Sequence, residues 1–418
     1  TTEMGKPLAE ARGEVAYGAS FIDWFGEEAR RVCGDVMESP IPDKRFLTFK
    51  QPIGVFGAIT PWNFPIAMIT RKVAPGIAAG CACVLKPAEQ TPLSALALAE
   101  LAHRAGLPAG VMNIVTGMDA PAMGSALCDD GRIRKMTFTG STEVGRILMR
   151  QSAGTLKKMS LELGGNAPLI VFDDADIDTA IAGTMASKYR NAGQTCVAPD
   201  YVLCPADRVK GFVDEFRRQF AAMYPSLRDN DDYTAIINER QYERLQGYLA
   251  DARDKGAELV ELNPARENLG AGTRKLPLTL VLRTTPDMKV MQDEIFGPIL
   301  PIVPYGSLDE AVHYINDRPR PLALYFFGYD RQQQQHVVDN THSGGMCIND
   351  ALMHVAQDDL PFGGIGDSGM GHYHGKEGFL TFSHHRAIFT KQKFNSGKFV
   401  YAPHGTAMHR LVYRFFIR

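Results

Sequence analysis

Short apolar runs alternate with helical segments through the first 153 residues, and this alternation limits the fold more than any other feature of the chain. Residues 55–60 form an uncharged run typical of a buried strand, and 66–79 has the apolar spacing of a helix. The same order continues with strands expected at 81–86, 111–116 and 135–139, and helices at 91–105, 123–128 and 144–153. Strands joined in this way by helices pair in parallel. The sequence therefore predicts an α/β protein with a doubly wound parallel sheet.

A second set of elements follows residue 162 and predicts a separate α/β layer. Strands are expected at 169–172, 201–204, 278–282 and 300–303, and helices at 177–190, 209–223, 239–255 and 308–316. Ahead of both sets, residues 7–31 are predicted as a long amphipathic helix and 46–50 as a strand. The candidate buried positions of that first helix are Ala11, Val15, Tyr17, Phe21 and Trp24.

Composition excludes several classes of protein. The chain has 418 residues, 45% of them hydrophobic, so it can bury two cores. Its 45 basic and 47 acidic residues nearly cancel, which gives no electrostatic reason to expect a nucleic-acid partner. The seven cysteines are irregularly spaced, which favours reduced thiols in the cytoplasm over a disulfide framework. We expect no signal peptide, because no basic segment precedes an apolar one at the start.

The stretch from residue 397 onward combines apolar and basic residues at helical spacing. Met408, Leu411, Val412, Phe415 and Phe416 are opposed by Arg410, Arg414 and Arg418. The segment is too short and too charged to cross a bilayer, and no transmembrane segment is expected. We favour an arm that packs on another subunit; attachment to the surface of an anionic membrane is the alternative.

Three motifs contain residues that could carry chemistry. Cys196 follows Gln-Thr, Glu162 opens Glu-Leu-Gly-Gly, and Asn63 is central in Pro-Trp-Asn-Phe-Pro. A thiolate beside a flexible glycine is an accessible nucleophile. A glutamate can act as the base that activates water, and an amide can donate to an oxyanion. Each residue alone would most often be structural, so the hypothesis depends on their occurrence together.

These motifs resemble those of NAD(P)-dependent aldehyde dehydrogenases, in the same order, together with Phe-Thr-Gly-Ser at 138–141, Glu-Ile-Phe-Gly-Pro at 294–298 and Pro-Phe-Gly-Gly at 361–364. The resemblance covers nearly the whole chain. It implies a NAD-binding domain at 1–163 with an arm strand near 43–51, a catalytic domain at 164–362, and a return segment with an oligomerisation arm at 363–418. It also implies that the first helices and an early strand of the family are missing here, as in a fragment.

The same resemblance implies assembly as a homodimer or homotetramer. The family joins subunits by adding a strand from one to the sheet of another, and residues 46–50 and 387–392 are the candidates for that contact. A small-molecule aldehyde is the expected substrate and NAD the expected cofactor, with NADP as the alternative. No metal ion is expected at the site.

The cofactor residues implied by the resemblance lie at strand-to-helix turns. Gly140 permits close approach of the backbone, and the helix that follows it attracts a pyrophosphate. Glu89, near Lys86, resembles the clamp on the adenosine ribose, where a carboxylate repels a 2'-phosphate and so favours NAD over NADP; a solvated loop charge is the alternative interpretation. The other candidates are Ile59, Trp62, Thr139, Ser141, Glu294 and Phe296.

Two parts of the chain indicate different substrates. Before about residue 196 the sequence resembles succinate-semialdehyde dehydrogenase, whose two carboxylate-binding arginines match Arg71 and Arg190. After it the sequence resembles coniferyl aldehyde dehydrogenase, and the loop at 350–356 lacks the serine of the carboxylate pocket. Met353, Val355 and Leu352 would there favour an aromatic or aliphatic tail. Succinate semialdehyde is the first hypothesis, coniferyl aldehyde the second, and a recombinant of two relatives is one origin for the mixture.

Two further interpretations remain open. The chain could be a catalytically silent NAD-binding or structural protein, although Cys196, Glu162 and Asn63 are all intact. The histidines near the end of the chain could suggest a metal site or a proton shuttle, but a polar surface role is favoured for His354, His372, His374, His384 and His385.

Overall fold

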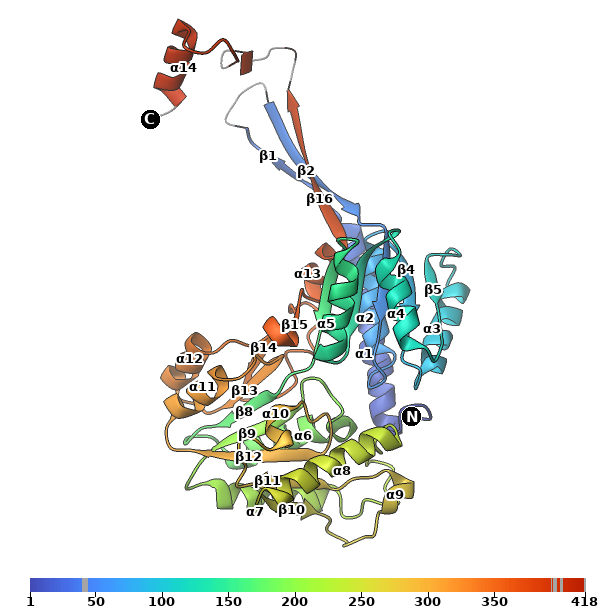
Figure 1. Ribbon diagram of the computed structural model, residues 1–418, viewed down its shortest axis with the longest axis vertical. Coiled ribbons are helices and arrows are strands. Elements are labelled where there is room, and N and C mark those ends of the chain that lie inside the picture. Colours follow the sequence, from blue (N-terminus) through green and yellow to red (C-terminus); the bar gives the residue numbers. More distant parts are fainter. Residues whose placement is uncertain (40–43, 392, 394–396, 399–400, 417–418) are drawn as a thin grey trace.

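The computed structural model describes residues 1–39, 44–391, 393, 397–398 and 401–416, and their strands form three sheets. Figure 1 shows two α/β bodies, one built on each of the larger sheets, and an arm that projects from one of them. The α/β fold with two separate sheets confirms the fold class expected from the sequence. The seven cysteines are all free.

The first body contains a six-stranded sheet in the order β15-β7-β6-β3-β4-β5. Strands β3 to β7 pair in parallel, and only the two-residue β15 runs antiparallel, against β7. The strands are β3 (Val55–Ile59), β4 (Ala82–Lys86), β5 (Met112–Ile114), β6 (Ile133–Thr139), β7 (Lys158–Glu162) and β15 (Gly369–Met370). The helices between them are α2 (Ala67–Ala78), α3 (Pro92–Arg104), α4 (Ala120–Asp129) and α5 (Thr142–Ala153).

The second body contains a seven-stranded sheet in the order β10-β11-β12-β9-β8-β13-β14, parallel except for the β10–β11 pair. Two large apolar clusters cover its faces. Its strands are β8 (Ala167–Val171), β9 (Pro199–Pro205), β10 (Glu258–Leu262), β11 (Leu278–Leu282), β12 (Ile299–Tyr305), β13 (Ala323–Phe327) and β14 (Gly345–Ile348). Its helices are α6 (Ile177–Tyr189), η2 (Arg190–Gly193), α7 (Val209–Met223), α8 (Glu239–Asp254), α9 (Gly270–Thr273), α10 (Lys289–Gln292), α11 (Leu308–Asn316) and α12 (Arg331–Asn340).

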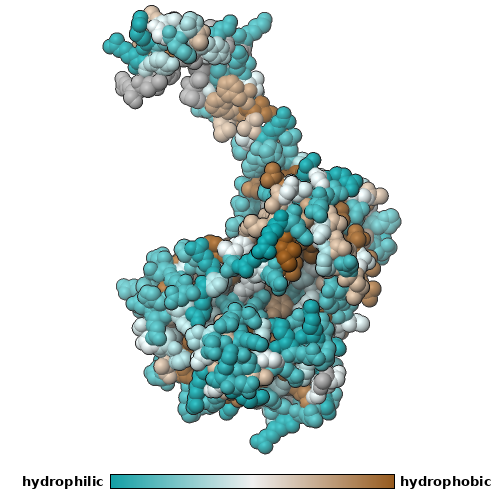
Figure 2. Space-filling view, viewed as in Figure 1, coloured by the Kyte–Doolittle hydropathy of each residue, from teal (hydrophilic) through white to brown (hydrophobic). Residues whose placement is uncertain are grey.

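The arm is a three-stranded antiparallel sheet in the order β1-β2-β16, with helix α14 at its tip (Figure 1). Its elements are β1 (Asp35–Met37), β2 (Lys44–Pro52), β16 (Ser383–Lys391) and α14 (Ala407–Phe416); η3 (Gly366–Ser368) and α13 (Gly375–Leu380) precede β16. Apolar residues lie on the surface of the arm among hydrophilic ones (Figure 2), including Phe389 and Phe415 at 59% and 73% exposure.

The strand pairing within the arm bears on the predicted contact between subunits, which stays a prediction. Residues 46–50 and 387–392 were candidates for a contact between subunits, but the structure pairs β2 with β16 inside the chain, with Phe46 opposite Phe389. Because β2 is the central strand of the arm, the outer edges of β16 and of the three-residue β1 are the ones left for another strand among the described residues. Residue 392 lies outside the described part of the chain.

The first helix, α1 (Leu8–Glu28), followed by η1 (Ala29–Arg31), exists where it was predicted, and its buried face includes Phe21 as predicted but differs at other positions. Glu14, Gly18, Phe21 and Phe25 are buried, whereas Val15 is 51% exposed. The prediction placed only apolar side chains on the buried face. It was wrong because the carboxylate of Glu14 has buried polar partners, which only the folded chain brings to it. None of the helices in the described ranges is both long and apolar enough to cross a membrane.

Candidate active site

The carboxyl ends of three neighbouring parallel strands form one wall of the site. Asn63 lies in the turn after β3, Thr139 is the last residue of β6, and Glu162 is the last residue of β7. Parallel strands end at the same edge of a sheet, so residues far apart in the sequence meet there. All three side chains are buried, Asn63 at 2%, Thr139 at 5% and Glu162 at 0% exposure.

The loop before Cys196 forms the opposite wall and has an unusual backbone. Asn191, Ala192 and Gly193 all have positive φ, at 59°, 51° and 75°. A Cβ at Gly193 would collide with the carbonyl of Gly297, so only glycine fits there. Gln194 anchors the loop to the second body, because its amide donates to Ala235 O at 3.1 Å and accepts from Ile237 N at 3.0 Å.

Cys196 and Glu162 are in direct contact across this gap. The Cys196 thiol donates to Glu162 Oε1 at 3.4 Å. Burial, followed by the negative charge of Glu162, raises the pKa of the thiol well above its ordinary value. The thiol is therefore protonated in this arrangement, and the group it faces is a carboxylate that could accept its proton.

Two cations hold Glu162 in its charged form. Arg71, from α2, is 1% exposed and forms an ion pair with Glu162 Oε2. Thr139 Oγ1 donates to the same oxygen at 2.9 Å, and Lys72 Nζ is 4.0 Å from it. Burial opposes ionisation of the carboxyl group, but the charges of Arg71 and Lys72 outweigh it and lower the pKa of Glu162 to about 2. Lys72 is a site residue that the sequence analysis missed; its position beside Arg71 was the available signal.

Asn63 joins the two walls. Its side-chain Nδ2 donates to Gln194 O at 3.1 Å, and its backbone carbonyl accepts from Asn191 Nδ2 at 3.1 Å. An amide nitrogen has two hydrogens, so the second N–H of Asn63 is available to another acceptor in the cleft. The structure thus brings together all three predicted catalytic residues, Cys196, Glu162 and Asn63.

A cleft of about 1070 Å³ opens onto these residues from between the two bodies. Six of the predicted cofactor residues line it with the catalytic three, namely Trp62, Thr139, Gly140, Ser141, Glu294 and Phe296. Arg244 lines it too and was not predicted; its guanidinium donates to Ile295 O at 2.7 Å and so fixes the loop that carries Glu294. The remaining predicted site residues, Ile59, Arg71, Lys86, Glu89 and Arg190, are not among its lining residues.

The cleft has the features that a dinucleotide requires. Helix α5 begins at its edge, where Ser141 Oγ accepts from Val144 N at 3.4 Å, and a helix N-terminus favours phosphate. Trp62 and Phe296 meet edge to face with ring centroids 5.4 Å apart. Burial, and the negative charge of Asp200, raise the pKa of Glu294 to about 8. A Cβ at Gly164 would collide with this carboxyl group, so glycine leaves it room. The residues present therefore fit NAD or NADP.

The predicted ribose clamp lies one strand farther along the sheet. Lys86, at the end of β4, is 4% exposed, and its Nζ contacts Glu89 Oε2 at 3.2 Å. Burial opposes the charge of Glu89, but its own backbone N–H and Lys86 outweigh burial and hold the pKa of Glu89 below its usual value. The carboxylate is therefore charged at neutral pH. Ile59 ends the neighbouring strand β3.

The two predicted substrate arginines differ in their surroundings. Arg71 is enclosed next to the rings of Phe362 and Tyr373, 5.5 and 5.2 Å from their centroids, and its Nε and Nη1 have no hydrogen-bond partner among the described residues. Arg190 is exposed at the start of η2. In the loop at 350–356, Leu352 and Val355 pack on the apolar cluster that Cys196 also contacts.

Two of the histidines expected on the surface are buried instead. His354 is 7% exposed, with Nδ1 3.1 Å from Cys347 Sγ, and His374 is 0% exposed and stacks on Phe362. Burial lowers their pKa values to about 4 and about 3. Their neutral rings pack against other side chains. The sequence did not predict this role, because a histidine in a polar, glycine-rich segment is usually on the surface. No three potential metal ligands cluster in the part of the chain that the structure describes.

Comparison with known proteins places this site in a family. Residues 1–388 match the family described as "Aldehyde dehydrogenase family". The chain is 49% identical, over 97% of its length and 82% of the relative, to a probable coniferyl aldehyde dehydrogenase of Pseudomonas aeruginosa. It is 45% identical, over 90% of its length and 78% of the relative, to the succinate-semialdehyde dehydrogenase [NADP(+)] GabD of Escherichia coli K12. Both resemblances therefore extend across the position of Cys196.

A solved structure has the same architecture. The substrate-bound state of Staphylococcus aureus AldH superposes on 99% of this chain and 89% of its own with a TM-score of 0.90, at 32% identity. The similarity thus extends across both bodies.

Proposed function

The chain belongs to the aldehyde dehydrogenase family and oxidises aldehydes with NAD or NADP, and from this premise we propose that its substrate is an aldehyde with a distal carboxylate, such as succinate semialdehyde. We further propose Cys196 as the nucleophile, Glu162 as the base and Asn63 as the oxyanion donor. The observation that carries these roles is the 3.4 Å contact from the Cys196 thiol to Glu162 beside the Asn63 amide.

In the first step Glu162 takes the thiol proton and the thiolate attacks the aldehyde carbon. The electron pair of the C=O bond moves to oxygen, and the oxyanion accepts hydrogen bonds from Asn63 Nδ2 and the backbone N–H of Cys196. When bound, NAD or NADP would be held by the residues that line the cleft and would accept the hydride that leaves the thiohemiacetal carbon, as the C=O bond re-forms to give the Cys196 thioester. After passing the thiol proton to solvent, Glu162 takes a proton from the water that attacks the thioester carbonyl. The C–S bond then breaks, the Cys196 sulfur regains a proton, and the acid is released.

Arg71 supports a carboxylate-bearing substrate. Its Nε and Nη1 are buried without a partner among the described residues, although the group is fully charged. Such atoms lose hydration without compensation, and a carboxylate would supply two hydrogen bonds. A carboxylate bound to Arg71 would also weaken its pair with Glu162, and the pKa of Glu162 would rise toward that of an effective base. The substrate tail would thereby promote the first step.

Steady-state kinetics with three aldehydes test this proposal. We expect Arg71→Met to raise KM and lower kcat for succinate semialdehyde, with a loss in kcat/KM of about 10²-fold, and to change butyraldehyde and coniferyl aldehyde much less. Arg190→Met is the matched control for a general loss of positive charge; if Arg190 also binds the carboxylate, it will raise KM alone. Equal losses on all three aldehydes with Arg71→Met would contradict carboxylate binding. Cys196→Ala should abolish turnover.

Coniferyl or another aromatic aldehyde is the second candidate. Leu352 and Val355 make the loop apolar where it packs on the cluster that Cys196 also contacts. No serine lies in 350–356. The 49% identical relative bears this name. A higher kcat/KM for coniferyl aldehyde than for succinate semialdehyde would favour this candidate.

We also propose a preference for NAD. The Glu89 carboxylate is charged and partly exposed next to Lys86, so it would accept hydrogen bonds from ribose hydroxyls and repel a 2'-phosphate. Glu89→Gln should therefore lower KM for NADP while leaving catalysis with NAD nearly unchanged. A wild-type enzyme that prefers NADP would contradict this assignment.

For assembly we propose a homodimer or homotetramer formed through the arm, in the cytoplasm, where the seven free cysteines stay reduced. The open edge of β16 and the exposed apolar residues of α14, Met408, Leu411 and Phe415, support an interface. Sedimentation of the full chain, and of a chain that ends at residue 391, should show a loss of assembly in the shorter one. A full chain that sediments as a monomer would overturn the proposal.

A further inference from the structure

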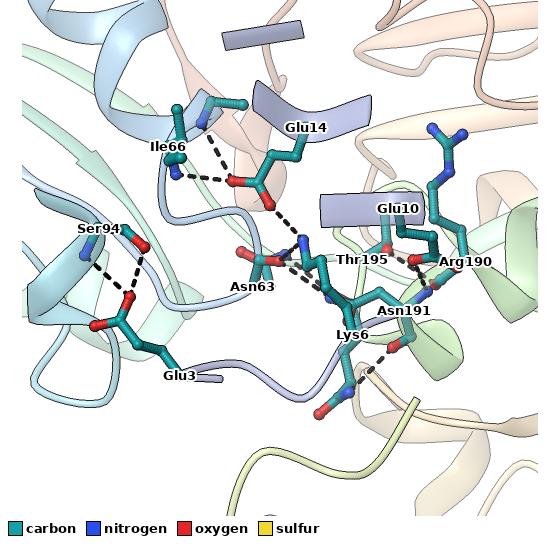
Figure 3. Close-up of polar contacts among 12 residues, drawn as sticks. Glu3, Lys6, Glu10, Glu14, Asn63, Ile66, Ser94, Arg190, Asn191 and Thr195 are labelled. Atoms are coloured by element: carbon teal, nitrogen blue, oxygen red, sulfur yellow. Dashed lines mark hydrogen bonds and ion pairs between the residues drawn. The ribbon is translucent and has the colours of Figure 1, made fainter. Parts of the chain in front are cut away.

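The segment that begins the chain reaches the centre of the site. Lys6 is 2% exposed, and its ammonium donates to Glu14 Oε2 at 2.5 Å and to the backbone carbonyl of Asn63 at 2.8 Å (Figure 3). The side chain of Glu14 is 4% exposed. Removing two charges from water costs free energy that only good geometry and additional hydrogen bonds offset. The burial of this ion pair therefore indicates a role beyond holding residues 1–7 against the rest of the protein.

Glu14 makes additional bonds at the start of α2. Its Oε1 accepts from Ile66 N at 2.8 Å and from Ala67 N at 3.4 Å, and no side chain of Ile66 itself caps this helix. The first N–H groups of a helix have no partner within it, so a carboxylate there fixes where the helix begins. This start, at Ala67, lies four residues after Asn63. Lys6 and Glu14 thus hold the turn of Asn63 at both ends.

The loop before Cys196 is held from the same segment. Glu10 Oε2 accepts from Asn191 N at 3.0 Å, and Asn191 Nδ2 donates to the Asn63 carbonyl that also accepts from Lys6 (Figure 3). Asn63 Nδ2 in turn donates to Gln194 O at 3.1 Å. Hydrogen bonds to the backbone carbonyl of Asn63 therefore fix this residue, and with it the side-chain amide, relative to Cys196.

We propose that Lys6, oriented by Glu14, is a positioning residue that aims the Asn63 amide at the oxyanion. This inference rests on the proposed function, because it assumes that Asn63 is the oxyanion donor. Lys6 acts through Asn63, since its ammonium contacts Glu14, the Asn63 carbonyl and the Phe64 ring, whose centroid is 4.0 Å away. An oxyanion donor must be fixed before the charge develops, and small displacements are costly.

Glu3 provides a matched control in the same segment. It caps α3 by accepting from Leu93 N at 2.5 Å and from Ser94 N at 3.0 Å, and these contacts do not include Asn63 or the loop of Cys196. If the segment served only to attach the terminus, Glu3→Gln and Lys6→Met would have similar effects. If Lys6 positions Asn63, Glu3→Gln should lower the melting temperature and leave kcat unchanged.

The decisive experiment is a double-mutant cycle between Lys6→Met and Asn63→Ala, with kcat and KM measured for NAD-dependent aldehyde oxidation. We expect Lys6→Met to lower kcat about 10–10²-fold with KM for NAD nearly unchanged, and to have almost no further effect when Asn63 is already alanine. If Lys6→Met does not fold, the double variant Lys6→Met/Glu14→Gln replaces it in the cycle. This variant removes both charges and keeps a side-chain oxygen that can accept from the first N–H groups of α2. Additive losses would overturn the proposal.

A second readout separates the Asn63 amide from the Cys196 loop as a whole. In a Cys33→Ser background, which removes the exposed cysteine, alkylation of Cys196 by iodoacetamide forms no oxyanion, whereas acylation by p-nitrophenyl acetate does. Lys6→Met should slow acylation and leave alkylation unchanged; equal slowing of both would overturn the proposal. If the wild type oxidises no aldehyde, the proposed function fails, and acylation still tests the coupling of Lys6 to Asn63.

Discussion

The two large sheets differ in what they bury. The six-stranded sheet and α2 carry Arg71, Lys72, Lys135 and Glu162 at 1% exposure or less. The seven-stranded sheet is covered by apolar clusters on both faces. Its buried charges include the pair of Lys188 and Asp200, 3.5 Å apart. Glu162 ends β7 next to Cys196, Arg71 and Lys72 lie beside it on α2, and Lys135 lies farther away on β6. The apolar sheet provides the platform on which the Cys196 loop is fixed.

The buried charges of the six-stranded sheet and the apolar clusters of the seven-stranded sheet therefore have different roles. Apolar burial stabilises a fold without regard to direction, whereas buried charges are costly unless each has a partner in good geometry. A core that retains them must gain something other than stability, and here the gain is a carboxylate held charged next to a thiol. Changes to the buried charges that contact Glu162 should therefore affect both chemistry and stability, and changes in the apolar clusters of the second sheet should affect stability alone.

Glu162→Gln should have the largest effect. Loss of the base should lower kcat by about 10²–10⁴-fold. Loss of the charge leaves Arg71 buried without its counter-ion, so the free energy of unfolding should fall by about 3–5 kcal/mol. Steady-state kinetics and urea unfolding measure the two effects. Cys196→Ala is the control, since it removes turnover and retains the ion pair. If Glu162→Gln unfolds with the same urea midpoint as the wild type, the comparison between the two sheets is contradicted.

Phe216→Ala tests the other side of the comparison. Phe216 lies on α7 at 0% exposure, beside Phe212 with ring centroids 5.8 Å apart. The cavity left by the ring should lower the free energy of unfolding by about 3–5 kcal/mol. Because the cluster carries no charge toward the site, kcat and KM should stay within about twofold of the wild type. A large fall in kcat in a folded variant would show that this core also shapes the chemistry.

A smaller effect is expected at His374, which packs between Phe21 and Phe362 near the first body. Burial lowers its pKa to about 3, whereas an unfolded histidine titrates near 6.5, so the unfolded chain binds the extra proton between these values. Its contribution to stability is fully present above pH 6.5 and is lost as pH falls toward 3. We expect a loss of about 2 kcal/mol between pH 7 and pH 5. His374→Phe should reduce this pH dependence of unfolding; an unchanged slope would exclude His374 as its source.

The sequence predicted some elements to the residue and missed others, including the wholly apolar β13. Residues 209–223, 278–282 and 308–316 were predicted with the bounds that the structure has, because their spacing alone indicates the element. Strand β7 was missed; its Lys-Met-Ser-Leu-Glu alternates polar and apolar residues, but the structure buries the polar Ser160 and Glu162 together with Leu161. Its Ser160 is buried only because Lys135 on the neighbouring strand supplies a hydrogen bond, and such a partner is not visible in a local pattern.

The same limit applies to the site. Cys196, Glu162 and Asn63 were found because each lies in a distinctive motif, and the structure brings them together. Glu14 was missed because an acid on a helical pattern indicates a solvated face, and Lys6 was missed because it precedes the predicted helix and lies in no candidate site motif. They are buried by contacts with residues 57 and 52 positions away in the sequence. Motifs therefore locate the reacting groups, and the groups that orient them require the fold.

The smallest effect expected is at Lys135, in the middle of the charged sheet. Its ammonium donates to Ser160 Oγ at 2.5 Å and to Thr381 Oγ1 at 3.0 Å, and burial, followed by the charge of Lys158, lowers its pKa to about 7. An unfolded lysine titrates near 10.4, so between these values the unfolded chain binds the extra proton and stability rises with pH. The free energy of unfolding should increase by about 1 kcal/mol between pH 7 and pH 8.

Lys135→Met should abolish this rise, while Lys210→Met, at an exposed pair with Asp214, should retain it. Because Lys135 touches no reacting group, kcat should not follow the same pH dependence. A parallel change in kcat would mean that the buried charges of the first sheet act as one titrating unit with the site.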